Sequence, residues 1–302
     1  VRGRAWFNFY STSTQRYEVA ANVNTSTLST SAVGSAARTP LFYQTSWVDR
    51  PETSYRGMYR SGGLEASKPA YHLGQNQQSL TDLPVRVHST GLLGTEWESD
   101  LGTAKVVTSQ LRDPGNRRLK GQLTYHGTQE LTEWFVAYGN FAYFPRTNRG
   151  ASQKPLKPGD EFSIDSARSN LLRGVLIGLT HTSIFEDGKM EGGANVNREI
   201  YDPLAREPLP ILRTLTFHEV TGGTTYTQLS NQSLRSADLS NLINLQRAVL
   251  FGRLKSPLTT FAVNGDEGEN VQQETVIRYL LPVQVDEIDV DAPPDPTLLK
   301  IK

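Results

Sequence analysis

The sequence predicts a mainly β protein built from two immunoglobulin- or fibronectin-like β-sandwich domains. Short runs rich in aromatic and β-branched residues recur along the chain, and most are bounded by Gly, Pro, Asn or Asp. The opening run alternates with a period of two. The length of 302 residues exceeds the size at which a single hydrophobic core usually stops growing, so two packed units are expected.

The first domain is predicted to cover residues 1–112. Its opening strand places Ala5, Phe7 and Phe9 on one face and the alternating residues, Trp6 among them, on the other. Further β-like runs follow at 17–23, 55–60, 68–73, 85–89, 93–98 and 104–111. Between the second and third runs, residues 24–38 are rich in Ser, Thr, Ala and Gly, which predicts a long loop that is mobile or bound to a partner.

A strong turn marks the start of the second domain, predicted to cover residues 113–285. In Asp113-Pro114-Gly115-Asn116 the proline presets one backbone dihedral and the glycine accepts positive φ, so the turn should join two strands as a hairpin. Later strands of this domain are predicted at 131–144, 162–165, 247–254, 258–264 and 275–285. An acidic, Pro-rich tail or linker at 286–302 ends the chain.

A helical insertion is expected at about 208–245 in the second domain. Apolar residues there recur at spacings of three and four, Pro210 suits a first helical turn and Gly222-Gly223 suits a helix end. A second short helix is expected over 236–245, with Ser236 or Asp238 as its cap. The segment 184–207 shows little periodicity and is interpreted as a surface excursion.

Composition excludes several classes of function. Lys plus Arg and Asp plus Glu both total 31, so no net field attracts nucleic acid or an anionic membrane. The absence of Cys excludes thiol catalysis and thiolate metal sites. The longest apolar stretch, 171–179, is far shorter than the ~20 residues of a membrane span. Because the chain begins with Val and has no basic and apolar leader, we expect a signal or anchoring segment outside it.

Three blocks of sequence carry a resemblance to a known family. The first is LPVRVHSTGLLGTEW at 83–97. The second is LKGQLTYH at 119–126, then 131–143 ending in AYGNFAY, then LKPG at 156–159. The third is ILRTLTFHE at 211–219, then Gly222-Gly223 and DLS at 238–240, then RAVLFG at 247–252 and RYLLPV at 278–283. Together they resemble the large extracytoplasmic regions of uncharacterised multi-pass membrane proteins of planctomycete-type bacteria. That family more often has Trp where this chain has His88. The resemblance implies a periplasmic or cell-envelope location and membrane anchoring by segments outside this chain, with no established activity.

No complete catalytic signature occurs in the sequence. The Gly-x-Ser-x-Gly elbow of α/β-hydrolases, the P-loop and the Gly-x-Gly-x-x-Gly fingerprint are all missing. His218-Glu219 approaches a metalloprotease helix, but the second zinc-binding His would stand at position 222, which is Gly. His218 is therefore expected to pack or hydrogen-bond near a helix C-terminus, and neither a metal nor a cofactor is predicted.

Three further groups of residues leave alternatives open. Asp266, Glu267 and Glu269 are weak calcium candidates, because the order Asp-x-Asp-x-Asp-Gly is absent. Scattered histidines could gather only through the fold; they are His72, His88, His126 and His181. Four tryptophans could form a sugar-stacking platform: Trp6, Trp47, Trp97 and Trp134. Packing in a hydrophobic core is the default interpretation, particularly for Trp97 and Trp134.

The sequence thus favours a non-enzymatic extracytoplasmic module that binds a protein partner or a cell-envelope component. The aromatic content with many Asn, Gln, Ser and Thr residues supports an alternative, a carbohydrate-binding or glycan-processing domain. A second alternative is a self-assembling shell or capsid-like subunit. A catalytic pair of carboxylates contributed by distant strands also stays open, because sequence spacing cannot reveal it.

Overall fold

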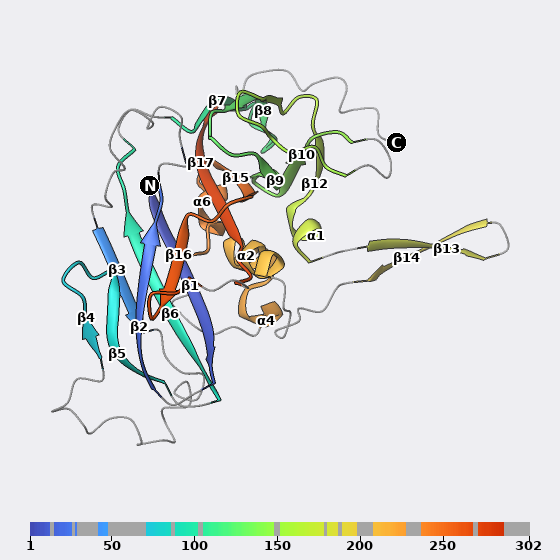
Figure 1. Ribbon diagram of the computed structural model, residues 1–302. Helices are drawn as coiled ribbons and strands as arrows, with labels where there is room; N and C mark the ends of the chain where they lie inside the picture. The colour runs from blue at the N-terminus through green and yellow to red at the C-terminus, as the bar shows by residue number, and fades with distance from the viewer. Residues whose placement is uncertain are drawn as a thin grey trace. The chain divides into compact units, whose positions relative to one another are not determined.

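The computed structural model is mainly β, as predicted, and falls into two compact units (Figure 1). It describes residues 1–12, 15–25, 28, 42–47, 71–85, 88–101, 105–147, 152–177, 180–186, 189–197, 208–227, 237–267 and 271–286. Unit 1 comprises 1–106, 127–129 and 256–275, and unit 2 comprises 107–126, 130–255 and 276–302. Within these described ranges, every helix is too short or too polar to cross a bilayer.

Unit 1 contains two antiparallel sheets. One has the strand order β1 (Arg2–Ser11), β6 (Ser89–Glu98) and β3 (Phe42–Trp47). The other has the order β16 (Thr259–Val263), β2 (Gln15–Val23), β5 (Ser79–Val85) and β4 (His72–Leu73). The sequence placed the strand at 258–264 in the second domain, whereas β16 pairs with β2 across more than 230 positions of the chain.

Aromatic rings from β1 contact the second of these sheets. Phe7 stacks on Phe261 of β16 with ring centroids 4.9 Å apart, and Phe9 meets Tyr17 of β2 edge-on at 5.5 Å. The predicted alternation of the opening strand is therefore confirmed for its inward face. Burial of large aromatic side chains is the main source of stabilisation in such a contact.

Two buried polar side chains tie the same sheets together. The indole Nε1 of Trp97 donates to Thr259 Oγ1 at 3.2 Å, and the hydroxyl of Tyr43 donates to the carbonyl of Ala21 at 2.6 Å. Gly3 stands directly opposite Trp97, and a Cβ at that position would lie 2.0 Å from the indole ring. A side chain at position 3 would therefore displace the largest ring in the core of unit 1.

Unit 2 is organised around one curled eight-stranded sheet. Its strands, in spatial order, are β11 (Glu161–Ser163), β8 (Lys120–Tyr125), β7 (Val107–Asp113), β17 (Thr275–Val285), β15 (Arg247–Leu254), β9 (Leu131–Tyr138), β10 (Phe141–Phe144) and β12 (Arg168–Leu171). The pairing of β17 with β7 is parallel, in contrast to the antiparallel pairs around it.

The predicted hairpin at the start of unit 2 is confirmed. Strands β7 and β8 pair antiparallel, and the turn between them is held by Asp113 Oδ1, which accepts from the Gly115 N–H at 3.0 Å. Gly115 has a φ of 87°, the left-handed conformation that favours glycine. Asp113 is buried, and its Oδ2 accepts a 2.7 Å hydrogen bond from the hydroxyl of Tyr138.

The helical insertion is confirmed for the described residues, but it is broken into short pieces. Besides α1 (Leu172–Leu176), the helices are α2 (Pro208–Thr216), α3 (His218–Thr221), α4 (Gly223–Thr227) and α6 (Ser240–Asn244). The sequence predicted one continuous helix over most of 208–223. The chain leaves helical geometry at Phe217, with a φ of −128°, and again at Gly222, with a φ of 117°.

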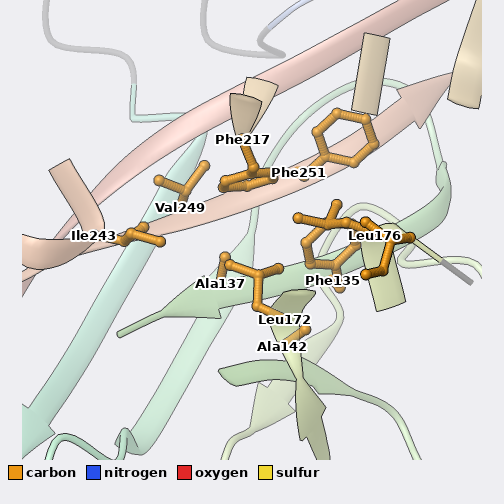
Figure 2. Packing of buried hydrophobic residues seen from close by; sticks show 10 residues of the cluster. Phe135, Ala137, Ala142, Leu172, Leu176, Phe217, Ile243, Val249 and Phe251 are labelled. Carbon is orange, nitrogen blue, oxygen red and sulfur yellow. The ribbon is translucent and has the colours of Figure 1, made fainter. Parts of the chain in front are cut away.

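These helices supply apolar side chains that cover the sheet of unit 2. Phe135 on β9 packs against Phe251 on β15 at 5.3 Å between ring centroids and against Phe217, between α2 and α3, at 5.8 Å (Figure 2). The cluster is formed by Phe135, Ala137, Ala142, Leu172, Leu176, Ile177, Phe217, Ile243, Val249 and Phe251. The break at Phe217 therefore turns an aromatic ring into the core.

Two strands were not anticipated from the sequence. β13 (Thr180–Glu186) and β14 (Lys189–Asn197) pair antiparallel, and the end of β13 and all of β14 fall in the segment 184–207 that was interpreted as an excursion. Gly192 and Gly193 lie inside β14 and carry no side chain that could reveal an alternating pattern. In unit 1, β3 was also not predicted and follows the predicted 24–38 loop. Most of that loop and the whole predicted run at 55–60 lie outside the described residues.

Candidate functional site

The outward side of the β1–β6–β3 sheet, called the outer face below, exposes large aromatic side chains. Trp6 retains 37% of its surface in contact with solvent, Tyr10 57% and Phe42 43%. Trp6 and Tyr10 belong to the set of β1 residues that alternates with the buried-side Phe7 and Phe9. Folding thus buries one aromatic row of β1 and leaves the other exposed.

Small residues lie beside Trp6 on the outer face. Trp6 stands opposite Gly94 of β6, and Gly94 in turn stands opposite Ser46 of β3. Glycine has no side chain and serine has a short one. The surface of the sheet next to the Trp6 indole is therefore not covered by large side chains from these two positions. The arrangement leaves the indole accessible to a ligand that lies across the strands.

Paired charges occupy one end of the outer face. Arg4 Nε lies 2.9 Å from Glu96 Oε1, and Arg2 lies 3.3 Å from Glu96 and 3.4 Å from Glu98. The pairs of Arg2 are exposed and contribute little to stability, whereas the Arg4 side chain is only 16% exposed. Their effect is to hold two guanidinium groups beside the aromatic residues while the region stays close to neutral.

Tyr10 and His88 meet at the other end of the outer face. The Tyr10 hydroxyl lies 2.8 Å from His88 Nδ1, and the ring centroids are 6.1 Å apart. His88 has a φ of 56°, in the left-handed region that is uncommon for residues other than glycine. Its N–H donates to the carbonyl of Ser11 at 2.8 Å, which continues the pairing of β1 with β6 beyond Ser11 and Ser89.

The four tryptophans divide between core and surface. Trp97 and Trp134 are each only 2% exposed, so the prediction that they belong to cores is confirmed. Trp6 departs from that default because it lies on the outward row of an edge strand. The side chain of Trp47 lies outside the described residues.

The scattered histidines do not form one metal-binding group in the described part of the chain. His72 lies 3.8 Å from Asp82 and is exposed, whereas His126 hydrogen-bonds to Thr108 at 2.9 Å. The side chain of His181 lies outside the described residues.

The calcium candidates are described only in part. Asp266 forms a β-bridge with Val263 at the end of β16. Glu267 Oε1 accepts from Thr260 Oγ1 at 3.3 Å and from Asn22 Nδ2 at 3.5 Å. Glu269 lies outside the described residues, so a calcium site here stays a prediction.

A second cluster, absent from the predicted sites, joins His218, Glu219 and Asp238 in unit 2. One potential ligand atom from each residue lies within 4.8 Å of the others. His218 begins the short helix α3 and comes two positions after Thr216, the last residue of α2, so it lies close to a helix C-terminus, buried and hydrogen-bonded, as predicted. Asp238 comes from the chain just before α6, twenty residues later.

Asp238 is fixed in place by hydrogen bonds to both helices. Its Oδ1 accepts from the backbone N–H of His218 at 3.0 Å and from the N–H and Oγ of Ser240 at 2.9 and 2.6 Å. Its Oδ2 accepts from the N–H of Glu219 at 3.2 Å. Asp238 was predicted to cap one helix. Its carboxylate accepts hydrogen bonds from backbone N–H groups at the N-termini of both α3 and α6.

The outer face and the His218 cluster are therefore the two places where the described structure presents chemistry that packing alone does not require. Comparison of the chain with protein-family models, with curated proteins and with solved structures finds no match.

Proposed function

We propose that this chain is a non-enzymatic, extracytoplasmic binding module of a membrane-anchored bacterial envelope protein, and that its outer face binds a protein partner. The observation that carries the proposal is the exposure of Trp6, Tyr10 and Phe42 on one side of a single sheet. Trp, Tyr and Arg are the residues most enriched at the energetic centres of protein interfaces.

The composition of the outer face suits a protein partner. Arg2 and Arg4 flank the aromatic residues and are already held by Glu96 and Glu98, so little side-chain freedom would be lost on binding. An open sheet face of three strands also suits a protein partner better than a small molecule, which usually binds in a concave pocket.

The finer fold assignment belongs to the same proposal. Two facing sheets in unit 1, joined by contacts such as Phe7 with Phe261, support an immunoglobulin-like sandwich there. For unit 2 the support is weaker, because one curled sheet covered by helices takes the place of a second sheet.

Location and anchoring rest on the resemblance to planctomycete-type envelope proteins. The near-neutral charge of the chain agrees with a partner recognised by contact, since no field of one sign would steer nucleic acid to it. Envelope extracts are accordingly the material in which to seek the partner.

The test is a pull-down from envelope extracts with the wild-type chain and with a Trp6→Ala/Tyr10→Ala variant as bait. A partner of the outer face is retained by the wild type, and its affinity falls at least about thirtyfold in the variant, the loss expected when hot-spot residues are truncated. The matched control is Leu171→Ala/Leu245→Ala, which removes two residues of unit 2 that are 62% and 67% exposed. If partners are lost equally with both variants, or are retained by both, the outer face is excluded as the binding surface.

Carbohydrate binding is the second candidate, and the exposure of Trp6 favours it. The outer face also carries Asn8 and Gln44, whose amides can hydrogen-bond to sugar hydroxyls while the indole stacks on a sugar ring. A glycan array probed with the same baits separates the two candidates. Binding that depends on Trp6 supports the sugar, whereas silence of the wild type on glycans removes this candidate.

A further inference from the structure

We propose that His218, Glu219 and Asp238 form a binding site for a divalent transition-metal ion such as Zn²⁺. The proposal is independent of the outer face, since all three residues belong to unit 2. It rests on the ring nitrogen that His218 presents to the two carboxylates.

The tautomer of His218 follows from its hydrogen bond to Thr227. The Thr227 hydroxyl donates to the carbonyl of Gly223 at 3.1 Å, so its oxygen accepts from His218 Nε2 at 2.9 Å. The proton of a neutral imidazole then resides on Nε2, and Nδ1 carries a lone pair. Metal-binding histidines typically have this arrangement, with the other ring nitrogen donating to a fixed acceptor.

The lone pair of His218 Nδ1 is buried without a hydrogen-bond partner among the described residues. The side chain is only 4% exposed, and the nearest charged atom is Glu219 Oε1 at 3.7 Å. A lone pair facing a carboxylate oxygen is repulsive, and leaving a buried polar atom unpaired is costly. A cation between the two atoms removes both penalties.

Asp238 supplies the third ligand from a position that is already fixed. Its Oδ1 accepts three hydrogen bonds, whereas Oδ2 accepts one from the described residues, that of the Glu219 N–H, and keeps a lone pair toward the cluster. The ligand atoms of the cluster lie within 4.8 Å of one another. Tetrahedral Zn²⁺ with bonds of about 2.1 Å separates its ligands by about 3.4 Å. The ligand atoms must therefore move closer by up to about 1.4 Å when the ion binds.

Glu219 is the residue able to make that movement. Its side chain is 59% exposed, which also gives an ion access from solvent. Gly223 lies beside it, and a Cβ there would stand 3.1 Å from Glu219 Oε2. The glycine thus leaves room for the carboxylate to swing toward His218.

One imidazole nitrogen and two carboxylate oxygens make a mixed donor set that suits Zn²⁺, Mn²⁺ or Co²⁺ better than Ca²⁺, which prefers six or more oxygens. Three protein ligands leave at least one position for water. The carboxylates also give the cluster a charge of −2, which favours a divalent ion.

The test is titration of the full chain, free of any affinity tag, with ZnCl₂ by calorimetry, and with CoCl₂ by visible absorption. The wild type should bind one ion per chain at this site, with a Co²⁺ spectrum typical of nitrogen and oxygen ligands. Saturating Zn²⁺ should raise Tm by about 5 °C or more. Glu219→Gln, which changes no buried packing, should weaken binding at least about tenfold.

The matched control is Glu161→Gln, the same change at an exposed carboxylate on β11, which should bind Zn²⁺ as the wild type does. Asp238→Asn is a second variant, and its folding is checked by circular dichroism before titration. Absence of Zn²⁺ binding by the folded wild type would overturn the proposal. Binding that is unchanged in both Glu219→Gln and Asp238→Asn would overturn it equally.

Discussion

The aromatic core of unit 2 and the outer face of unit 1 use the same kinds of side chain in opposite ways. In the core, Phe135, Phe217 and Phe251 are at most 1% exposed, and their ring centroids lie 5.3 to 6.4 Å apart. On the outer face, Trp6 and Tyr10 keep 37% and 57% of their surface in solvent. Aromatic content alone therefore says nothing about whether a residue stabilises the fold or is available to a partner.

The difference comes from what covers each sheet. Strands β9 and β15 are covered by helical segments, and Phe217 enters the core because helical geometry breaks at that residue. On β1, by contrast, one row of side chains packs on the facing sheet while Trp6 and Tyr10 point the other way. Large aromatic side chains kept at a surface cost solubility, which is the physical reason to assign them a binding role.

The largest effect is expected from removing a ring of the core. Phe251→Ala should lower the free energy of unfolding of unit 2 by about 3–5 kcal/mol, because it deletes a fully buried side chain and leaves a cavity. Trp6→Ala should change stability by about 1 kcal/mol or less, since part of its ring is already solvated. Urea unfolding followed by near-ultraviolet circular dichroism measures both.

Phe251→Leu is the control for this comparison, because it keeps most of the apolar volume and should lose less stability than Phe251→Ala. Equal losses for Phe251→Ala and Trp6→Ala would break the comparison. That result would mean that the outer face is itself covered in solution, for example by another copy of the chain.

Local physical chemistry explains which parts of the fold could be predicted. The alternation of β1 depends only on the period of an extended chain, and the turn from Asp113 to Gly115 depends on dihedral preferences of adjacent residues. Both predictions are confirmed. By contrast, β16 belongs to unit 1 because it pairs with β2, a strand far away in the sequence. The residues next to β16 in the chain do not indicate this pairing.

The same distinction applies to the candidate sites. The outward position of Trp6 could be read from the alternation of β1, but its exposure could not, because that depends on which elements cover the sheet. For the cluster, the His218-Glu219 pair is visible in the sequence, but position 222, one helical turn after His218, is Gly and offers no third ligand. The third member, Asp238, is twenty residues distant and is brought close by the pairing of α3 with the start of α6.

An intermediate effect is expected at high pH in unit 2. Burial raises the pKa of Tyr125 to about 12, from the ordinary value of 10.0 that the unfolded chain should keep. Below pH 10 both states hold the proton, so the contribution of Tyr125 is fully present. Between pH 10 and about 12 only the unfolded state loses the proton, and stability falls by about 1.4 kcal/mol per pH unit.

Tyr125→Phe should remove this contribution to the slope. Urea midpoints measured from pH 8 to pH 11 should run parallel for wild type and variant up to pH 10 and then converge or cross as the wild type loses stability faster. Two other tyrosines of unit 2, the buried Tyr138 and the half-buried Tyr279, also have a raised pKa and leave a residual slope in the variant. Parallel profiles throughout would show that Tyr125 is solvated in the folded state.

The smallest effect is expected at the exposed end of the outer face. Tyr10→Phe removes the hydroxyl that lies 2.8 Å from His88 Nδ1, and water can replace the lost bond on both sides, so stability should change by about 0.5 kcal/mol or less. A double-mutant cycle with His88→Ala measures the coupling between the two side chains directly. Coupling near zero agrees with a solvated outer face that is free to meet a partner. Coupling above about 1.5 kcal/mol, the value of a desolvated bond, would instead require a further layer over this face in solution, and the contrast with the core of unit 2 would disappear.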